Sequence, residues 1–179
     1  MTQIERAYDG TIPFALMVVV LLTTGVFLWR SFNGNEPLGA RSIASIRVAL
    51  LTASVACVLY VTLLPAQVGE GGSELMPFTN LDSYAGRSQA IANTLLLIPT
   101  GFLYALNIAR GRERPIRNLA AFAVLFSVGL EVAQGVLPIH RVVATEDVLI
   151  HVVGGLVGGL AAFAICAVAP RRVIAVTAA

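Results

Sequence analysis

Apolar residues occur along this chain in long blocks and do not alternate with polar ones. A bilayer core of roughly 30 Å requires about 20 mainly apolar residues in a helix. Five blocks meet that requirement, and we expect an all-α membrane protein, a bundle of five transmembrane helices. The predicted spans are Thr11 to Trp29, Ile43 to Leu64, Ala90 to Ile108, Asn118 to Leu137 and Asp147 to Ala169.

The composition supports a chain solvated by lipid. Hydrophobic residues make up 57% of the sequence and charged residues 12%, against about 25% charged residues in an average soluble domain. Twelve basic and ten acidic residues nearly cancel, and no basic stripe interleaved with aromatics predicts nucleic-acid binding. Cys57 and Cys166 lie in apolar stretches without CxxC spacing, which favours small buried residues over a disulfide or metal site. We expect no metal and no cofactor.

The first block could be mistaken for a signal peptide. The residues before it include Glu5 and Asp9 beside a single basic residue, Arg6, and no small-residue cleavage site follows Trp29. A signal peptide has a positively charged start. We therefore interpret the block as a helix.

The distribution of arginine predicts an orientation. With five crossings, nine arginines fall on one side of the membrane and three on the other, and the positive-inside rule places the richer side in the cytoplasm. The N-terminus is then outside and the C-terminus cytoplasmic. The nine are Arg30, Arg41, Arg47, Arg110, Arg112, Arg114, Arg117, Arg171 and Arg172; the three are Arg6, Arg87 and Arg141.

These spans divide the chain into four regions. Residues 1–64 form an N-terminal two-helix scaffold, and residues 65–89 form an extracytoplasmic loop. Residues 90–169 form a three-helix core, and residues 170–179 form a cytoplasmic tail. The loop contains the longest linker, from Pro65 to Ser88.

Polar residues gather near the outer ends of the last three predicted helices. Ser127, Glu131 and Gln134 share one face of the fourth helix by their spacing, and Asp147 and His151 share a face of the fifth. An ionisable group in a span costs about 2.5–3.5 kcal/mol near the centre, so each needs a partner or a function. A hairpin between the two helices should bring these residues together with Arg141, and Asn93 of the third helix could hydrogen-bond to them. The candidate polar cluster is Asn93, Ser127, Glu131, Gln134, Arg141, Asp147 and His151.

Small residues and a proline predict how the helices pack. In the fifth helix, Gly154 with Gly158 and Gly155 with Gly159 form two overlapping GxxxG pairs, which allow close approach of a neighbouring backbone. Pro99 and Gly101 lie in the middle of the third span and should kink or loosen it.

Together these motifs resemble the VanZ-like family of bacterial multi-pass membrane proteins. The family pattern has an Asn before an apolar stretch with Pro-x-Gly, then Ser-x3-Glu-x2-Gln, then Arg-x5-Asp-x3-Asn-x2-Gly-x3-Gly. The matching residues lie between about Leu75 and Gly159, with His151 where the family usually has Asn. The resemblance implies a protein of the bacterial plasma membrane and cell envelope. Through the family's name-giving member, it also implies a contribution to resistance against the glycopeptide antibiotic teicoplanin.

The residues leave several functions open for the cluster. It could bind an envelope ligand, such as a lipid head group, a lipid-linked cell-wall precursor or a glycopeptide, with Arg141 contacting phosphate or carboxylate. It could form an intramembrane metal-dependent or acid/base enzyme on Glu131, Asp147 and His151, although no established catalytic signature such as HExxH or GxSxG is present. Proton-coupled transport and a purely structural polar clamp between helices are the remaining alternatives. Oligomeric state is not predicted.

Overall fold

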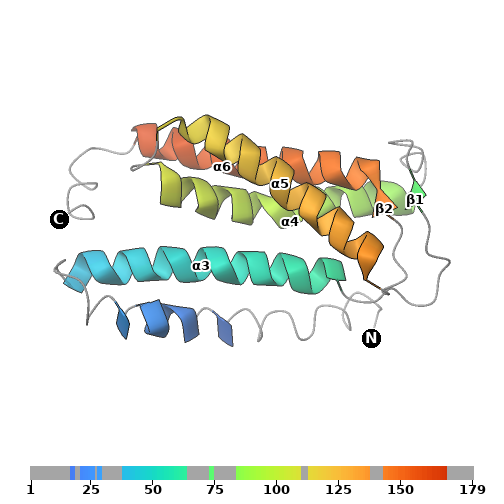
Figure 1. The fold of residues 1–179 in the computed structure, drawn as a ribbon. Coiled ribbons are helices and arrows are strands. Elements are labelled where there is room, and N and C mark those ends of the chain that lie inside the picture. The colour runs from blue at the N-terminus through green and yellow to red at the C-terminus, as the bar shows by residue number, and fades with distance from the viewer. Residues whose placement is uncertain are drawn as a thin grey trace.

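The computed structural model of this chain describes residues 17–18, 21–26, 28–29, 38–63, 73–74, 84–109, 113–137 and 143–168. Four long helices and two short strands dominate this part (Figure 1). The elements are α3 (Leu38–Leu63), β1 (Ser73–Glu74), α4 (Tyr84–Ile108), α5 (Pro115–Val136), β2 (Val143–Ala144) and α6 (Thr145–Val168).

Each long helix contains a stretch that is long and apolar enough to cross a membrane. Among the described residues these stretches are Ser42–Leu63, Arg87–Ile108, Pro115–Val136 and Thr145–Val168. The helical class and the last four predicted spans are confirmed, with ends shifted by a few residues. The largest shift is in α4, which begins at Tyr84, because a helix can continue past the apolar block that marks a span.

The first predicted span, Thr11 to Trp29, is described only in part. Residues 17–18, 21–26 and 28–29 are helical, and this described portion does not by itself provide a fifth candidate span. The chain therefore has four candidate spans in the described residues. The fifth, and the orientation of the termini, stay predictions.

Helix α4 is the central element of the bundle. It has its most extensive contact with α6, and it also contacts α3 and α5 (Figure 1). Two groups of buried apolar side chains join these helices. Ala105, Leu119 and Ala162 connect α4, α5 and α6, whereas Val58, Leu97 and Leu130 connect α3, α4 and α5.

Glycines allow the contact between α4 and α6. A Cβ added at Gly154 or Gly158 would overlap the backbone of Thr94 or Ile98 of α4, and a Cβ at Gly101 would overlap the carbonyl of Gly155. The two backbones can approach this closely only because hydrogens occupy those positions. Helix α4 continues through Pro99, which is exposed on its surface.

The two strands were not predicted. Ser73 pairs with Val143 and Glu74 with Ala144 in a parallel ladder. A two-residue pairing has no detectable alternation of apolar and polar positions, so the sequence pattern gives no signal for it. The ladder attaches the predicted loop of residues 65–89 to the beginning of α6, where the polar cluster was expected.

Candidate functional site

The contacts between α5 and α6 establish which polar residues lie opposite one another. A Cβ added at Gly135 would lie 3.2 Å from Cγ2 of Val143, and a Cβ added at Gly155 would lie 3.4 Å from Cβ of Ala123. Between these two contacts, antiparallel helices advance by equal numbers of residues in opposite directions. Glu131 is therefore level with Asp147, and Ser127 is level with His151 one turn farther in.

Six of the seven residues of the candidate cluster lie in the described part of the chain. Five of them are buried: Ser127 at 0%, His151 at 1%, Glu131 at 4%, Gln134 at 6% and Asp147 at 8% exposure. Asn93 is half-buried. The seventh, Arg141, lies outside the described residues, as does His140.

Asp147 and Glu131 are connected to neighbouring elements by hydrogen bonds. Asn93 Nδ2 of α4 donates to Asp147 Oδ1 at 2.8 Å, and the backbone N–H of Ala144 in β2 donates to Glu131 Oε2 at 3.2 Å. A hydrogen bond to a charged group is worth about 1.5–3 kcal/mol. These two bonds therefore offset part of the cost of burying two carboxylates at one level of the bundle.

Gln134 is hydrogen-bonded to helix α3. Its Nε2 donates to the backbone carbonyl of Thr62 at 3.0 Å, which connects α5 to the end of α3. Sequence reasoning missed this contribution of α3, because a backbone acceptor has no residue-specific signal. It missed the Ala144 amide for the same reason.

Ser127 and His151 differ from the rest of the cluster. Within the described part of the chain, Ser127 Oγ and both ring nitrogens of His151 have no hydrogen-bond partner. The level of His151 on α4 follows from two contacts, Asn93 with Asp147 and Gly101 with Gly155, because Leu97 lies midway between Asn93 and Gly101. The apolar side chain of Leu97 is at that level. The polar residue of α4 beside it is Thr94, whose backbone lies against Gly154 and whose hydroxyl donates to the Ala90 carbonyl at 2.9 Å.

A buried polar atom without a partner costs about 1–3 kcal/mol. Two polar side chains at one level, both enclosed and both without partners, have the capacity to bind a group that donates and accepts hydrogen bonds. A serine hydroxyl can do both, and a neutral imidazole has one donor and one acceptor nitrogen. The arrangement fits a neutral polar group at the inner end of the site.

The donor set for a metal ion is limited. Among the described residues, no group of three or more His, Cys, Asp or Glu side chains is placed to hold a metal. Cys57 and Cys166 are free thiols on α3 and α6.

Comparisons with known proteins identify the family. The family model described as VanZ/LLP1 matches residues 16–167, a range that includes the two strands and the four long helices except Val168, the last residue of α6. No curated protein and no solved structure matches the chain. The four apolar helices and the family match together establish a VanZ-like, multi-pass membrane protein. The chain belongs to the VanZ/LLP1 family.

Proposed function

We propose that this protein binds the polar head group of an envelope lipid or a lipid-linked cell-wall precursor. The binding site in this proposal is the polar cluster between α4, α5 and α6. The observation that carries the proposal is the pair Ser127 and His151, which are buried, level with each other and without hydrogen-bond partners in the described residues. A bound head group would supply the missing hydrogen bonds.

The arrangement of charge favours a ligand with two kinds of polar group. Hydroxyl or amide groups of a sugar or peptide fit Ser127 and His151 at the inner end. At the next level out, Glu131 and Asp147 are acceptors, and an anionic phosphate needs a cation there. In the proposal Arg141 supplies that cation as a planar two-pronged donor.

A clamp between helices is the competing explanation, and Ser127 distinguishes the two. Every polar group of a clamp should be paired within the protein, since only paired groups stabilise helix contacts. Asn93 and Gln134 meet that expectation, whereas Ser127 and His151 do not. An unpaired buried hydroxyl adds nothing to a clamp.

The test compares binding with stability in the purified full chain. Native mass spectrometry would measure binding of three probes: a glycosyl diacylglycerol, a polyprenyl-linked disaccharide-pentapeptide and phosphatidylcholine. Ser127→Ala should lower binding of the first two probes about tenfold, because about one buried hydrogen bond is lost. Its stability without lipid should be unchanged or higher, because an unpaired buried hydroxyl is removed.

Thr100→Val provides the matched control. Thr100 is fully buried and its hydroxyl pairs with Ser54 at 2.6 Å, away from the cluster. This variant should lose stability and keep probe binding. If Ser127→Ala and His151→Leu both bind the sugar-bearing probes like the wild type, the proposed function is wrong.

The resemblance to the family adds a cellular extension of this proposal. We propose that the protein acts in the bacterial plasma membrane and contributes to tolerance of teicoplanin. Deletion of the gene should then lower the teicoplanin concentration that inhibits growth. Complementation with the wild-type gene should restore it, and complementation with Ser127→Ala should not.

A further inference from the structure

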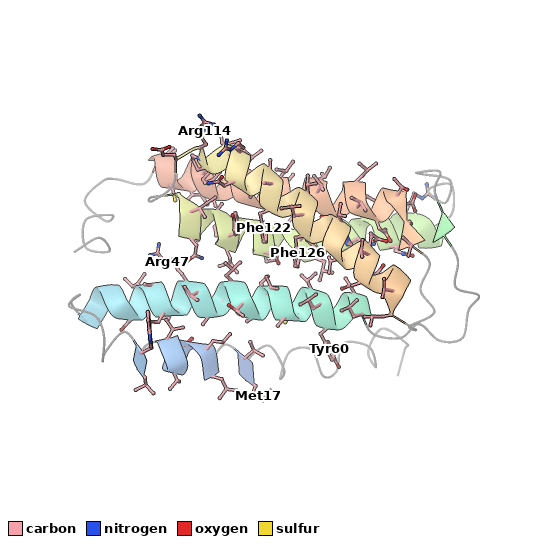
Figure 2. All side chains as sticks on the ribbon, viewed as in Figure 1. Met17, Arg47, Tyr60, Arg114, Phe122 and Phe126 are labelled. Atoms are coloured by element: carbon pink, nitrogen blue, oxygen red, sulfur yellow. The ribbon has the colours of Figure 1, made fainter. Side chains whose placement is uncertain are left out.

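Arg47 is an ionisable residue inside a candidate span, and it does not belong to the polar cluster. It lies five residues into the apolar stretch Ser42–Leu63 of α3. Its side chain is half-buried, and its Nε atom is enclosed without a hydrogen-bond partner in the described residues. Figure 2 shows the side chain extending from α3 toward the side of the bundle where α4 lies. The Nε–H of this charged group can therefore donate to an acceptor from outside the described residues.

One hydrogen bond between α3 and α4 indicates which residue of α4 lies opposite Arg47. Ser54 Oγ and Thr100 Oγ1 lie 2.6 Å apart and connect the antiparallel helices α3 and α4. Two turns away, on the same faces, the residues are Arg47 and Asn107. Asn107 Nδ2 donates to Leu103 O at 2.8 Å, which leaves a second amide N–H for another acceptor.

The other charged side chains described at this end of the bundle give it a positive balance. Arg114 and Arg117 lie at the start of α5, with Glu113 beside them, and all three are exposed. Arg114 and Arg47 lie at the same end of the molecule (Figure 2). Three basic residues against one acidic residue make this end attractive to an anion at the membrane surface.

An apolar groove begins one turn from Arg47 and Asn107. It lies between α3 and α4, has a volume of about 580 Å³, and its lining includes Leu50, Cys57, Leu95, Pro99 and Leu103. Leu50 and Leu103 form the end nearest the two polar residues. From Leu103 to Ala92, at the other end of the lining, α4 rises about 16 Å. The groove is therefore long, narrow and apolar, with a cation at one end.

We propose that α3 and α4 bind one phospholipid from the leaflet at the Arg47 end of the bundle. The lipid phosphate contacts the Arg47 guanidinium through paired N–H···O bonds and accepts a further bond from the free amide N–H of Asn107. One acyl chain occupies the groove. This site lies at the opposite end of the bundle from the Asp147 cluster and does not depend on the function proposed there.

Lipid retention by the purified full chain tests the proposal. The probes are phosphatidylglycerol and phosphatidylcholine with identical acyl chains, added to delipidated protein in detergent and measured by native mass spectrometry. Arg47→Gln should weaken phosphatidylglycerol binding about tenfold, as expected for loss of a charge-assisted contact. Arg117→Gln makes the same charge change at an exposed residue of the same end and should retain nearly wild-type binding.

The groove has its own matched pair of variants. Cys57→Phe fills the groove and should also reduce phosphatidylglycerol binding, whereas Cys166→Phe makes the same change on α6, outside the groove lining. Inorganic phosphate at millimolar concentration should not displace the lipid, because it lacks the acyl chain. Arg47→Lys keeps the positive charge and should bind better than Arg47→Gln, which separates loss of charge from loss of folding. Equal phosphatidylglycerol binding by Arg47→Gln and Arg117→Gln would overturn the proposal, as would equal binding by the two cysteine variants.

Discussion

The close contact between α4 and α6 makes the stability of the bundle sensitive to a single methyl group at Gly158. Gly158 is buried. With the backbone unchanged, a Cβ at this position would overlap the carbonyl of Ile98. In Gly158→Ala the two helices must separate until that atom reaches an ordinary van der Waals distance. The perturbation therefore acts on the largest helix contact in the described structure.

The magnitude follows from the loss of dispersion contacts. A gap of 0.5–1 Å already forfeits roughly a quarter to a half of the attraction between facing atoms, and relief of the overlap at Gly158 requires a wider gap. If the atoms affected equal those around one buried Leu side chain, about 50 contacts of about 0.15 kcal/mol, the loss is at least about 2–4 kcal/mol. Alanine recovers up to about 1 kcal/mol through its higher helix propensity. The expected net destabilisation is therefore at least about 1 kcal/mol.

Gly129→Ala is the matched control. Gly129 is exposed on α5, and a Cβ there would have no atom within 4 Å in the described structure. Only helix propensity changes in this variant, so its stability should stay within about 1 kcal/mol of the wild type or rise. Reversible unfolding in mixed micelles of increasing sodium dodecyl sulfate, followed by circular dichroism, measures both variants. The reasoning is refuted if Gly158→Ala is as stable as Gly129→Ala.

Two further predictions concern the hydrogen bonds of the cluster. Asn93→Leu removes the amide donor to Asp147 Oδ1 and should lower stability by about 1–3 kcal/mol in the same unfolding assay, because a buried carboxylate loses a bond. Asn93→Asp should be worse than Asn93→Leu, because it replaces the amide donor with a second carboxyl group beside Asp147, and the reverse order would contradict this reasoning. Gln134→Leu removes the bond to the Thr62 carbonyl and should cost about 1 kcal/mol. Unchanged stability of Gln134→Leu would show that apolar packing alone positions the end of α3.

Much of this architecture was predictable because a bilayer imposes simple requirements on a sequence. Apolar length identified the last four spans to within a few residues at most ends. Helical spacing identified the common face of Ser127, Glu131 and Gln134, and all three are buried. Helical spacing also identified the overlapping glycine pairs of α6 as packing positions, and these glycines lie at contacts with α4 and α5.

The sequence could not predict the contacts that depend on backbone atoms or on tertiary register. The carbonyl of Thr62 and the amide of Ala144 are hydrogen-bonding groups that every residue type has, so no pattern reveals them. The pairing of Ser73 with Val143 joins segments far apart in the chain through two residues only. The level of Ser127 against His151 also requires the helix register, because spacing within one helix says nothing of its neighbour.

The two halves of helix α3 are attached differently. Its C-terminal half has hydrogen bonds from Ser54 to α4 and from the Thr62 carbonyl to α5, and Val58 is buried between these two positions. Its N-terminal half has Arg47, whose Nε atom has no hydrogen-bond partner in the described residues, one turn from an apolar groove. A lipid bound there would supply a polar contact for Arg47. Phosphatidylglycerol should therefore raise the stability of the wild type more than that of Arg47→Gln, by RT ln(1 + [L]/Kd) for the lipid concentration used.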